Sequence, residues 1–216
     1  MRRKIGLVTL ILISLNTQFA YATNYSEYDF AIEVKQKIGL AVNTDNKAWN
    51  AELARSYCSL RELLGQKPNK KKPTDVELEN FKVEILNFVK PIEKLPYHEE
   101  GLNISVTCQM AYFVREGMIE KILPVSTGKS STKSDLGKFK VFYKVKGWQE
   151  SSLYPGAMMY KPIWYNGNEG VHGMESDKLV HSYPASHGCV RAKKQDMDWL
   201  VKNLQKGDTV KVYGKW

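Results

Sequence analysis

The hydrophobic period of the chain changes near Gly101, and this change constrains the fold more than any other feature of the sequence. In residues 45–64, apolar side chains recur at the spacing of a helical stripe. In residues 104–108, apolar and polar side chains alternate instead, as they do in a half-buried strand. We therefore predict an α-helical N-terminal region over residues 23–100, followed by a mainly β domain over residues 101–214.

The N-terminal region has the boundary signals of two helices. Gly65 follows the first helix at a position that commonly ends one. Thr74 and Glu77 form the pattern of a capping box at the start of the second helix, which Pro91 would terminate. Two roles stay open for this region: a recognition or docking unit, or simple packing against the β domain. We favour the packing role.

The second half of the chain contains short strand-like segments and one late helix. Residues 112–115 and 118–125 fit a hairpin that Glu116 and Gly117 would close. Three further segments fit the same architecture, namely strands at 138–145 and 210–213 and a helix marked by the apolar positions of residues 197–204.

The first 22 residues have the layout of a cleaved export signal. Three basic residues at positions 2–4 precede an apolar run from Ile5 to Leu15 and a small-residue triplet at positions 20–22. The apolar run is shorter than the roughly 20 residues of a membrane-spanning helix, and no later stretch approaches that length. We expect an exported protein, in the periplasm, with no stable membrane span after signal cleavage. An uncleaved N-terminal anchor is the alternative.

The charge and the cysteine content of the chain limit its possible binding partners and its cellular compartment. The formal net charge of +9 falls to +6 once the three basic residues of the signal are removed. This mild excess suits an anionic polymer such as the cell wall, and it does not indicate a nucleic-acid partner. Cys58 and Cys108 are the pair expected to bridge in an oxidising compartment, which would leave Cys189 free. The sequence alone does not show that these two cysteines lie within bridging distance of each other.

A cluster of reactive residue types lies in the last quarter of the chain. His172, His181 and His187 are three of only four histidines, and all precede Cys189 closely. A thiol becomes a useful nucleophile when an imidazole accepts its proton and backbone N–H groups face the carbonyl oxygen under attack. Gly188 suits this chemistry, because a residue without a side chain allows a tight turn and close approach of a substrate. The cluster predicts a cysteine–histidine catalytic site.

The residues around this cluster resemble a family signature. His172-Gly173 followed by Ser186-His187-Gly188-Cys189-Val190-Arg191 is similar to the signature of the YkuD-type L,D-transpeptidases. The segment Pro-Val-Ser-Thr-Gly at residues 124–128 resembles the strand and turn that this family carries early in its domain. The resemblance runs from about Ile104 to Val212, and it implies a β-sandwich catalytic domain with one or more short helices.

The resemblance also implies a role for each residue of the signature. Cys189 would be the nucleophile that carries the acyl group, and His172 would be its general base, oriented by a backbone carbonyl near Gly173. His181 matches no position of the motif and receives no role. The other implied residues fall into two groups: backbone groups of the oxyanion hole at Gly173, Gly188 and Cys189, and substrate contacts at Tyr160, Ser186, His187 and Arg191. For His187 a purely structural role is the alternative.

The implied reaction is acyl transfer between peptidoglycan stem peptides. The thiolate would attack the amide between the third residue of a tetrapeptide stem and its terminal D-alanine, which leaves. The acceptor would be a diaminopimelate amine, giving a 3→3 crosslink, or a lysine of an outer-membrane lipoprotein, a free D-amino acid, or water. Transfer to water would make the enzyme an L,D-carboxypeptidase. The sequence contains no phosphate loop or nucleotide fingerprint, so no cofactor is expected.

One segment departs from the family pattern. Where the family usually has Thr-Pro-x-Gly, this chain reads Ser134-Asp135-Leu136-Gly137. Proline presets one backbone angle without taking part in the chemistry. Its absence therefore puts the rigidity of this loop and the choice of acceptor in doubt, rather than the acylation step.

Three other hypotheses use the same residues. A zinc site is disfavoured, because the three histidines and Cys189 are separated by nine, six and two positions, unlike the close ligand pairs of structural zinc sites. An NlpC-type peptidase has its cysteine before its histidine, the reverse of the order here. The third is a wall-binding protein with a catalytically idle domain, against which the intact His172 and Cys189 argue.

Overall fold

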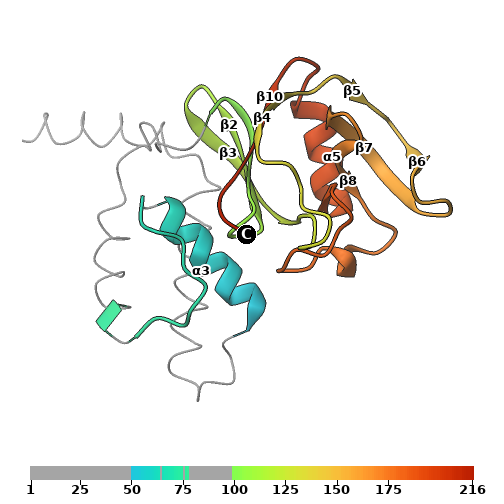
Figure 1. Ribbon diagram of the computed structural model, residues 1–216. Coiled ribbons are helices and arrows are strands. Elements are labelled where there is room, and N and C mark those ends of the chain that lie inside the picture. Colours follow the sequence, from blue (N-terminus) through green and yellow to red (C-terminus); the bar gives the residue numbers. More distant parts are fainter. Residues whose placement is uncertain (1–49, 64, 75, 78–98) are drawn as a thin grey trace, which may run out of the picture.

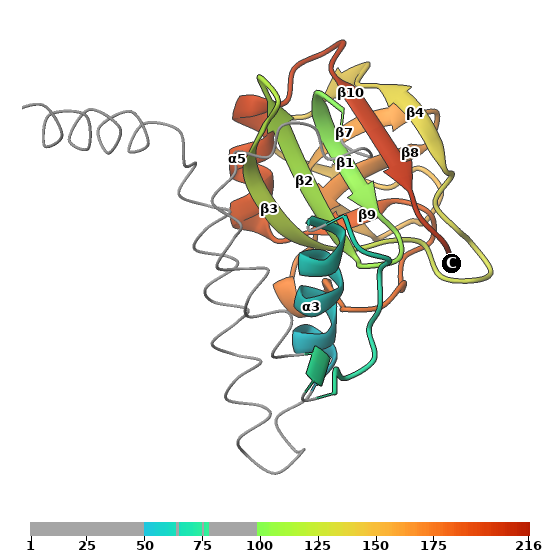
Figure 2. The ribbon, with the colours of Figure 1, turned by 90° about the vertical axis from the view of Figure 1, so that its left-hand side faces the viewer.

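The computed structural model describes residues 50–63, 65–74, 76–77 and 99–216. In this part of the chain, ten strands form one sheet, with helix α5 (Lys194–Asn203) and helix α3 (Ala51–Leu63) on opposite sides of its first strands (Figures 1 and 2). The predicted export signal and most of the predicted second helix lie outside the described residues. No helix among the described residues is long and apolar enough to cross a membrane.

The sheet is continuous and mixed. Its order is β4-β10-β1-β2-β3-β9-β8-β7-β5, and β6 also pairs with β7. The pairs β1–β10 and β8–β9 are parallel, and the others are antiparallel. The strands are β1 (Gly101–Ser105), β2 (Met110–Arg115), β3 (Met118–Ser126), β4 (Gly137–Lys140), β5 (Tyr143–Lys144), β6 (Trp148–Glu150), β7 (Met158–Asn166), β8 (Glu169–Gly173), β9 (Val190–Ala192) and β10 (Thr209–Tyr213).

Strand β3 joins the two halves of this sheet, which corrects the predicted β-sandwich. Most of β3 pairs with β2, but its last residues, Val125 and Ser126, pair with Ala192 and Arg191 of β9. The two halves are therefore one curled sheet rather than two separate sheets packed face to face. Its apolar interior includes residues of both halves together with Met197, Leu200 and Leu204 from α5 and the residues that follow it.

Strands β1 and β2 are buried on both faces, and α3 packs on part of the face that the main core does not cover. In β1, Leu102 and Ile104 point into the main core, while Asn103 and Ser105 are also buried. Alternation along a strand places these two pairs on opposite faces. The polar positions that suggested a solvent-facing strand surface are thus covered by packing.

Helix α3 confirms the first predicted helix over the residues that the structure describes. Cys58 and Leu63 of this helix pack with Met110, Tyr112 and Val114 of β2. The buried Glu62 accepts hydrogen bonds from the hydroxyls of Ser105 (2.8 Å), Tyr112 (3.1 Å) and Tyr213 (3.4 Å). This helix therefore packs against the sheet. Both predicted roles of the N-terminal region stay open.

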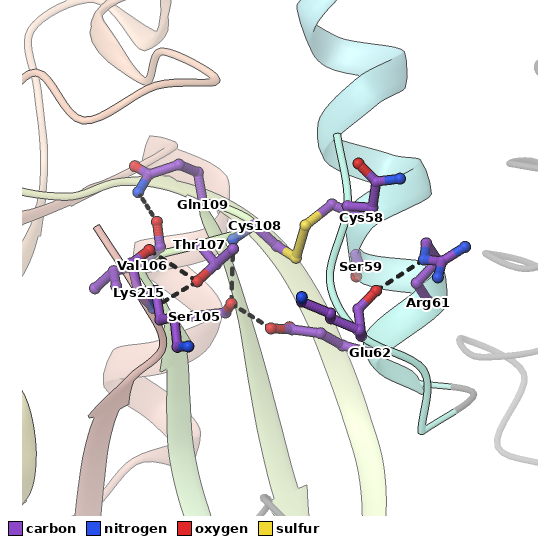
Figure 3. The surroundings of a disulfide bond; sticks show 12 residues. Cys58, Ser59, Arg61, Glu62, Ser105, Val106, Thr107, Cys108, Gln109 and Lys215 are labelled. Carbon is purple, nitrogen blue, oxygen red and sulfur yellow. Dashed lines mark hydrogen bonds between the residues drawn. A yellow bond between two sulfur atoms is a disulfide. The ribbon is translucent and has the colours of Figure 1, made fainter. Parts of the chain in front are cut away.

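The expected pairing of Cys58 with Cys108 is confirmed. A disulfide joins the two residues, which are 50 positions apart, and both are fully buried (Figure 3). It connects α3 to the turn at residues 106–109 that follows β1. The strand predicted from the alternation in residues 104–108 was therefore too long. Strand β1 ends at Ser105, where the chain turns and the backbone N–H of Gln109 donates to the Ser105 carbonyl.

Other local predictions have mixed outcomes. The hairpin closed by Glu116 and Gly117 is confirmed by the pairing of β2 with β3, and the late helix is confirmed as α5. The capping box is present, with the Thr74 backbone N–H donating to a Glu77 carboxylate oxygen at 2.8 Å and the Glu77 N–H to Thr74 Oγ1 at 3.3 Å. The predicted strand at 138–145 is instead two short strands, β4 and β5.

Candidate active site

A cleft of about 270 Å³ lies over β7, β8 and the loop before β9, bordered by the connection between β6 and β7. It brings together five of the residues that the signature implied: His172, Ser186, His187, Cys189 and Arg191. Its other lining residues are mostly apolar or neutral: Gln149, Ser151, Ser152, Leu153, Tyr154, Ala157, Met158, Met159, Trp164, Asn168 and Met174. Among all of these lining residues, only Arg191 has a permanent charge.

The parallel pairing of β8 with β9 explains how residues distant in sequence meet in this cleft. Val171 pairs with Val190, and both point into the main core. The next pair, His172 and Arg191, therefore faces the other side, because side chains alternate along a strand. Cys189 lies two residues before Arg191 and shares that side, so the histidine, the cysteine and the arginine all line the cleft.

His172 is held in one tautomer. Its side chain is buried, and Nδ1 lies 2.9 Å from the carbonyl oxygen of Gly173. Only a protonated nitrogen can pair with a carbonyl, so Nδ1 carries the hydrogen and Nε2 is the basic nitrogen. Burial lowers the pKa of His172 to about 4, against the opposing effect of the Gly173 hydrogen bond. The imidazole is therefore neutral, with a free lone pair, at neutral pH.

Cys189 is the free thiol of the described chain and is partly exposed. Its Sγ lies 3.5 Å from the carbonyl oxygen of Asn168, to which the thiol donates. Burial raises the pKa of the thiol, and the Glu169 carboxylate adds to this, while the N–H of Gly170 and the charge of Arg191 act in the opposite direction. The resting pair is accordingly a neutral thiol and a neutral imidazole.

The loop that carries Cys189 is braced by its own hydrogen bonds. The Ser186 hydroxyl donates to the Cys189 carbonyl and accepts from the Gly188 N–H at 3.2 Å. The Ser134 hydroxyl donates to the Gly188 carbonyl. Gly188 has φ +125°, a conformation that side-chain-bearing residues rarely adopt. The tight turn is as predicted, but the Gly188 N–H already has a partner, so it is not a free oxyanion donor in this structure.

Gly173 lies at a point of close packing between β7 and β8. A Cβ atom at this position would lie 3.0 Å from Tyr160 Cβ. Tyr160 itself is not among the residues that line the cleft; its hydroxyl donates to Asp198 of α5 at 2.9 Å. The preceding residues of β7, Met158 and Met159, line the cleft instead.

The other two histidines of the cluster lie in different surroundings. His187 lies on the cleft wall, with its ring 4.8 Å from that of Tyr154 and its Nε2 3.3 Å from Lys129 Nζ. His181 does not line the cleft and stacks on Tyr183, with ring centroids 4.8 Å apart. The carbonyl of His181 accepts a hydrogen bond from the buried Arg55 of α3 at 3.2 Å.

The segment that departs from the family pattern is held by hydrogen bonds where the family has proline. The backbone N–H of Asp135 donates to both carboxylate oxygens of Glu169, at 3.2 and 3.1 Å. The Asp135 carboxylate accepts from the Asn166 side-chain amide at 3.0 Å. A proline has no N–H and could not make the first of these contacts. This loop is thus anchored beside Cys189 by a means that the sequence comparison did not suggest.

Several residues of the cleft were missed from the sequence. Leu153 and Tyr154 belong to the connection between β6 and β7, and Asn168 belongs to the turn between β7 and β8. Neither segment has a periodic pattern or a motif. The Pro155-Gly156 pair indicated only a turn at that point.

The sequence of the described domain matches a known family. A family model, described as the L,D-transpeptidase catalytic domain (YkuD), matches residues 102–212, just over half of the 216-residue chain. The chain belongs to this family.

Among the described residues, no three His, Cys, Asp or Glu side chains come together as a group that could hold a metal ion.

Two solved structures show the same fold. The L,D-transpeptidase (residues 123–326) from Xylanimonas cellulosilytica DSM 15894 is 23% identical, with a TM-score of 0.54, and the match covers 74% of this chain and 80% of that one. The L,D-transpeptidase (Yku) from Stackebrandtia nassauensis is 21% identical, with a TM-score of 0.51 and coverage of 88% and 92%. No curated protein matches the sequence.

Proposed function

We propose that this protein transfers acyl groups between peptidoglycan stem peptides, with Cys189 as nucleophile and His172 as base. Membership of the family implies the enzyme class and the stem-peptide substrates. The observation that carries the residue assignment is the position of His172 on β8 and of Cys189 directly before the adjacent parallel strand β9, in one cleft. The signal at 1–22, the N-terminal region at 23–100 and the catalytic domain at 101–214 belong to the same proposal.

In the first half-reaction the thiol turns from the Asn168 carbonyl towards Nε2 of His172, which takes its proton. Sulfur attacks the carbonyl carbon of the third stem residue, and the oxyanion is stabilised by backbone N–H groups that include that of Cys189. The C–N bond to D-alanine then breaks. His172 returns the proton to the departing amine, which leaves a thioester on Cys189.

In the second half-reaction an amine of a neighbouring stem attacks the thioester carbonyl. His172 accepts a proton from this amine and passes it to the departing sulfur, which restores the thiol. A new amide forms and the C–S bond breaks. A lysine of an outer-membrane lipoprotein or a free D-amino acid would react in the same way, whereas water would give a tripeptide.

Arg191 provides the charge complementarity for the donor stem. Its guanidinium is the permanent charge in a lining that is otherwise neutral. A carboxylate of the stem is the substrate group that such a side chain binds in pairs of hydrogen bonds. Ser186 and His187 border the same cleft and contact the stem beside it. The apolar wall of methionines and aromatic rings accommodates the aliphatic chain of the third residue.

The compartment follows from the disulfide and the family. Buried disulfides persist in oxidising compartments, and peptidoglycan lies outside the cytoplasm. Both indicate an extracytoplasmic location. We propose the periplasm, reached through the export signal at residues 1–22.

The test of the function is incubation of the purified protein with a disaccharide-tetrapeptide that contains diaminopimelate, followed by mass spectrometry of the products and of the intact protein. Release of D-alanine with a 3→3 dimer is the expected result. Release with only the tripeptide would assign an L,D-carboxypeptidase instead. No release and no acyl adduct would contradict the enzyme assignment and leave the idle, wall-binding alternative.

The neutral resting pair predicts the pH dependence of acylation. His172 must be neutral to accept the thiol proton, and its pKa is lowered to about 4 by burial. The acylation rate should therefore be constant from about pH 5 to pH 8 and fall as His172 becomes protonated near pH 4. Stopped-flow or mass-spectrometric acylation rates with meropenem would measure this, with circular dichroism to verify folding at each pH. An acid limb near pH 6.5 would show instead an imidazole with its ordinary pKa.

A further inference from the structure

Gln109 is a buried polar residue outside the cleft whose side chain is fully engaged. Its exposed fraction is 0%, and it lies in the turn between β1 and β2 with φ +57°. The side-chain Nε2 donates to the Val106 carbonyl at 2.6 Å and to Thr127 Oγ1 at 2.8 Å, and Oε1 accepts from the Thr127 N–H at 2.8 Å. Figure 3 shows the amide directed at Val106. Such a residue fixes the position of whatever it contacts.

Thr127 connects Gln109 to the loop that carries Cys189. Its carbonyl accepts the backbone N–H groups of Ala185 (2.9 Å) and Ser186 (3.0 Å). Thr127 is itself fully buried, and all of its polar atoms are used in these contacts and in those to Gln109. Ser186 in turn bonds the Gly188 N–H and the Cys189 carbonyl. A continuous chain of hydrogen bonds therefore runs from Gln109 to the backbone around the nucleophile.

The turn that presents Gln109 is itself anchored. Cys108, the preceding residue, is bonded to Cys58 of α3, and the Cys108 N–H donates to Ser105 Oγ at 3.2 Å. The Gln109 backbone bonds Ser105 and Val125 on either side, at 2.8 and 3.0 Å. The amide of Gln109 thus belongs to a turn whose backbone is fixed on both sides. Precise positioning of a reactive loop requires such a fixed neighbour.

We propose that Gln109 is a positioning residue, which acts through Thr127 and Ser186 to hold the backbone N–H of Cys189 in the geometry that acylation needs. This inference rests on the proposed function. Formation of a thioester passes through an oxyanion that must meet its N–H donors, one of which Cys189 supplies, and small displacements of such donors are costly. Alkylation of the same thiol by iodoacetamide forms no oxyanion and does not need them.

The experiment compares these two reactions of Cys189 in full-length protein, at a temperature where every variant is folded. Gln109→Met removes the amide and keeps an unbranched chain of similar length. We expect its acylation rate constant with meropenem to fall by about 10- to 100-fold, while its alkylation rate with iodoacetamide stays within about two-fold. The matched control is Tyr112→Phe, which removes buried hydrogen bonds to Ser59 and Glu62 on the α3 side of β2 and should leave both rates unchanged.

The outcomes separate the inference from the function. A wild-type protein that meropenem does not acylate would refute the proposed function and this role with it. A Gln109→Met protein that is less stable but is acylated at the wild-type rate would refute the positioning role alone, as would equal losses of acylation and alkylation. If Gln109→Met does not fold, Thr127→Val decides, because it removes one of the two bonds to Gln109. It should lose acylation by about three- to ten-fold, and an unchanged rate would refute the role.

Discussion

Cys189→Ala is expected to abolish D-alanine release, with a loss of at least about 10⁴-fold, and to eliminate the covalent adduct with meropenem. The reason is chemical, because no other described thiol is free to attack a carbonyl. The substitution removes one contact of the fold, from Sγ to the Asn168 carbonyl. We therefore expect the melting temperature to stay close to that of the wild type. Intact-mass spectrometry and a D-alanine assay on the same samples measure both effects.

A second pair of variants separates the nucleophile from its base. His172→Gln should slow acylation by about 10²- to 10⁴-fold but still give the adduct after long incubation, because the thiol remains. His181→Gln is the matched control, since this histidine belongs to the same sequence cluster but does not line the cleft. Its rate should stay within about two-fold of the wild-type rate. An adduct on the Cys189→Ala protein would place the nucleophile elsewhere.

The turns of this domain could be predicted further than its overall architecture, because their signals are local. Gly188 is confined to a turn by its own conformation, and the Glu116-Gly117 turn pairs two strands that are adjacent in the chain. The pairing of β1 with β10 joins residues more than a hundred positions apart. Strands of two or three residues, such as β5 and β6, are too short to have a measurable period. Neither the pairing of β1 with β10 nor these short strands could be found from periodicity.

Residue types in the site were easier to predict than the directions of their groups. Ser186 borders the cleft as expected, yet its hydroxyl is used within the loop. Tyr160 is next to cleft-lining residues, but its hydroxyl contacts α5. Both orientations depend on neighbours from distant segments. The burial of Ser105 has the same origin, because its hydroxyl donates to Glu62 of α3.

Removal of the disulfide should have a large effect on stability. Replacing both Cys58 and Cys108 with alanine is expected to lower the free energy of unfolding by about 4 kcal/mol, the loop-closure value for residues 50 positions apart. The crosslink acts mainly by restricting the unfolded chain, so the loss should appear without disruption of the folded sheet. Urea unfolding of the variant and the wild type, followed by tryptophan fluorescence, measures it.

Cys189→Ala is the natural control for this measurement, because it makes the same chemical change at a cysteine that closes no loop. The double variant should keep α3 docked at 25 °C, since Ser105 still donates to Glu62 and Arg55 still donates to the carbonyls of Val125 and His181. A loss below about 1 kcal/mol would mean that these polar contacts, together with the apolar packing of Leu63, hold the helix without the bridge. A loss near 4 kcal/mol with a native-like circular dichroism spectrum would show that the bridge stabilises the protein through the unfolded state.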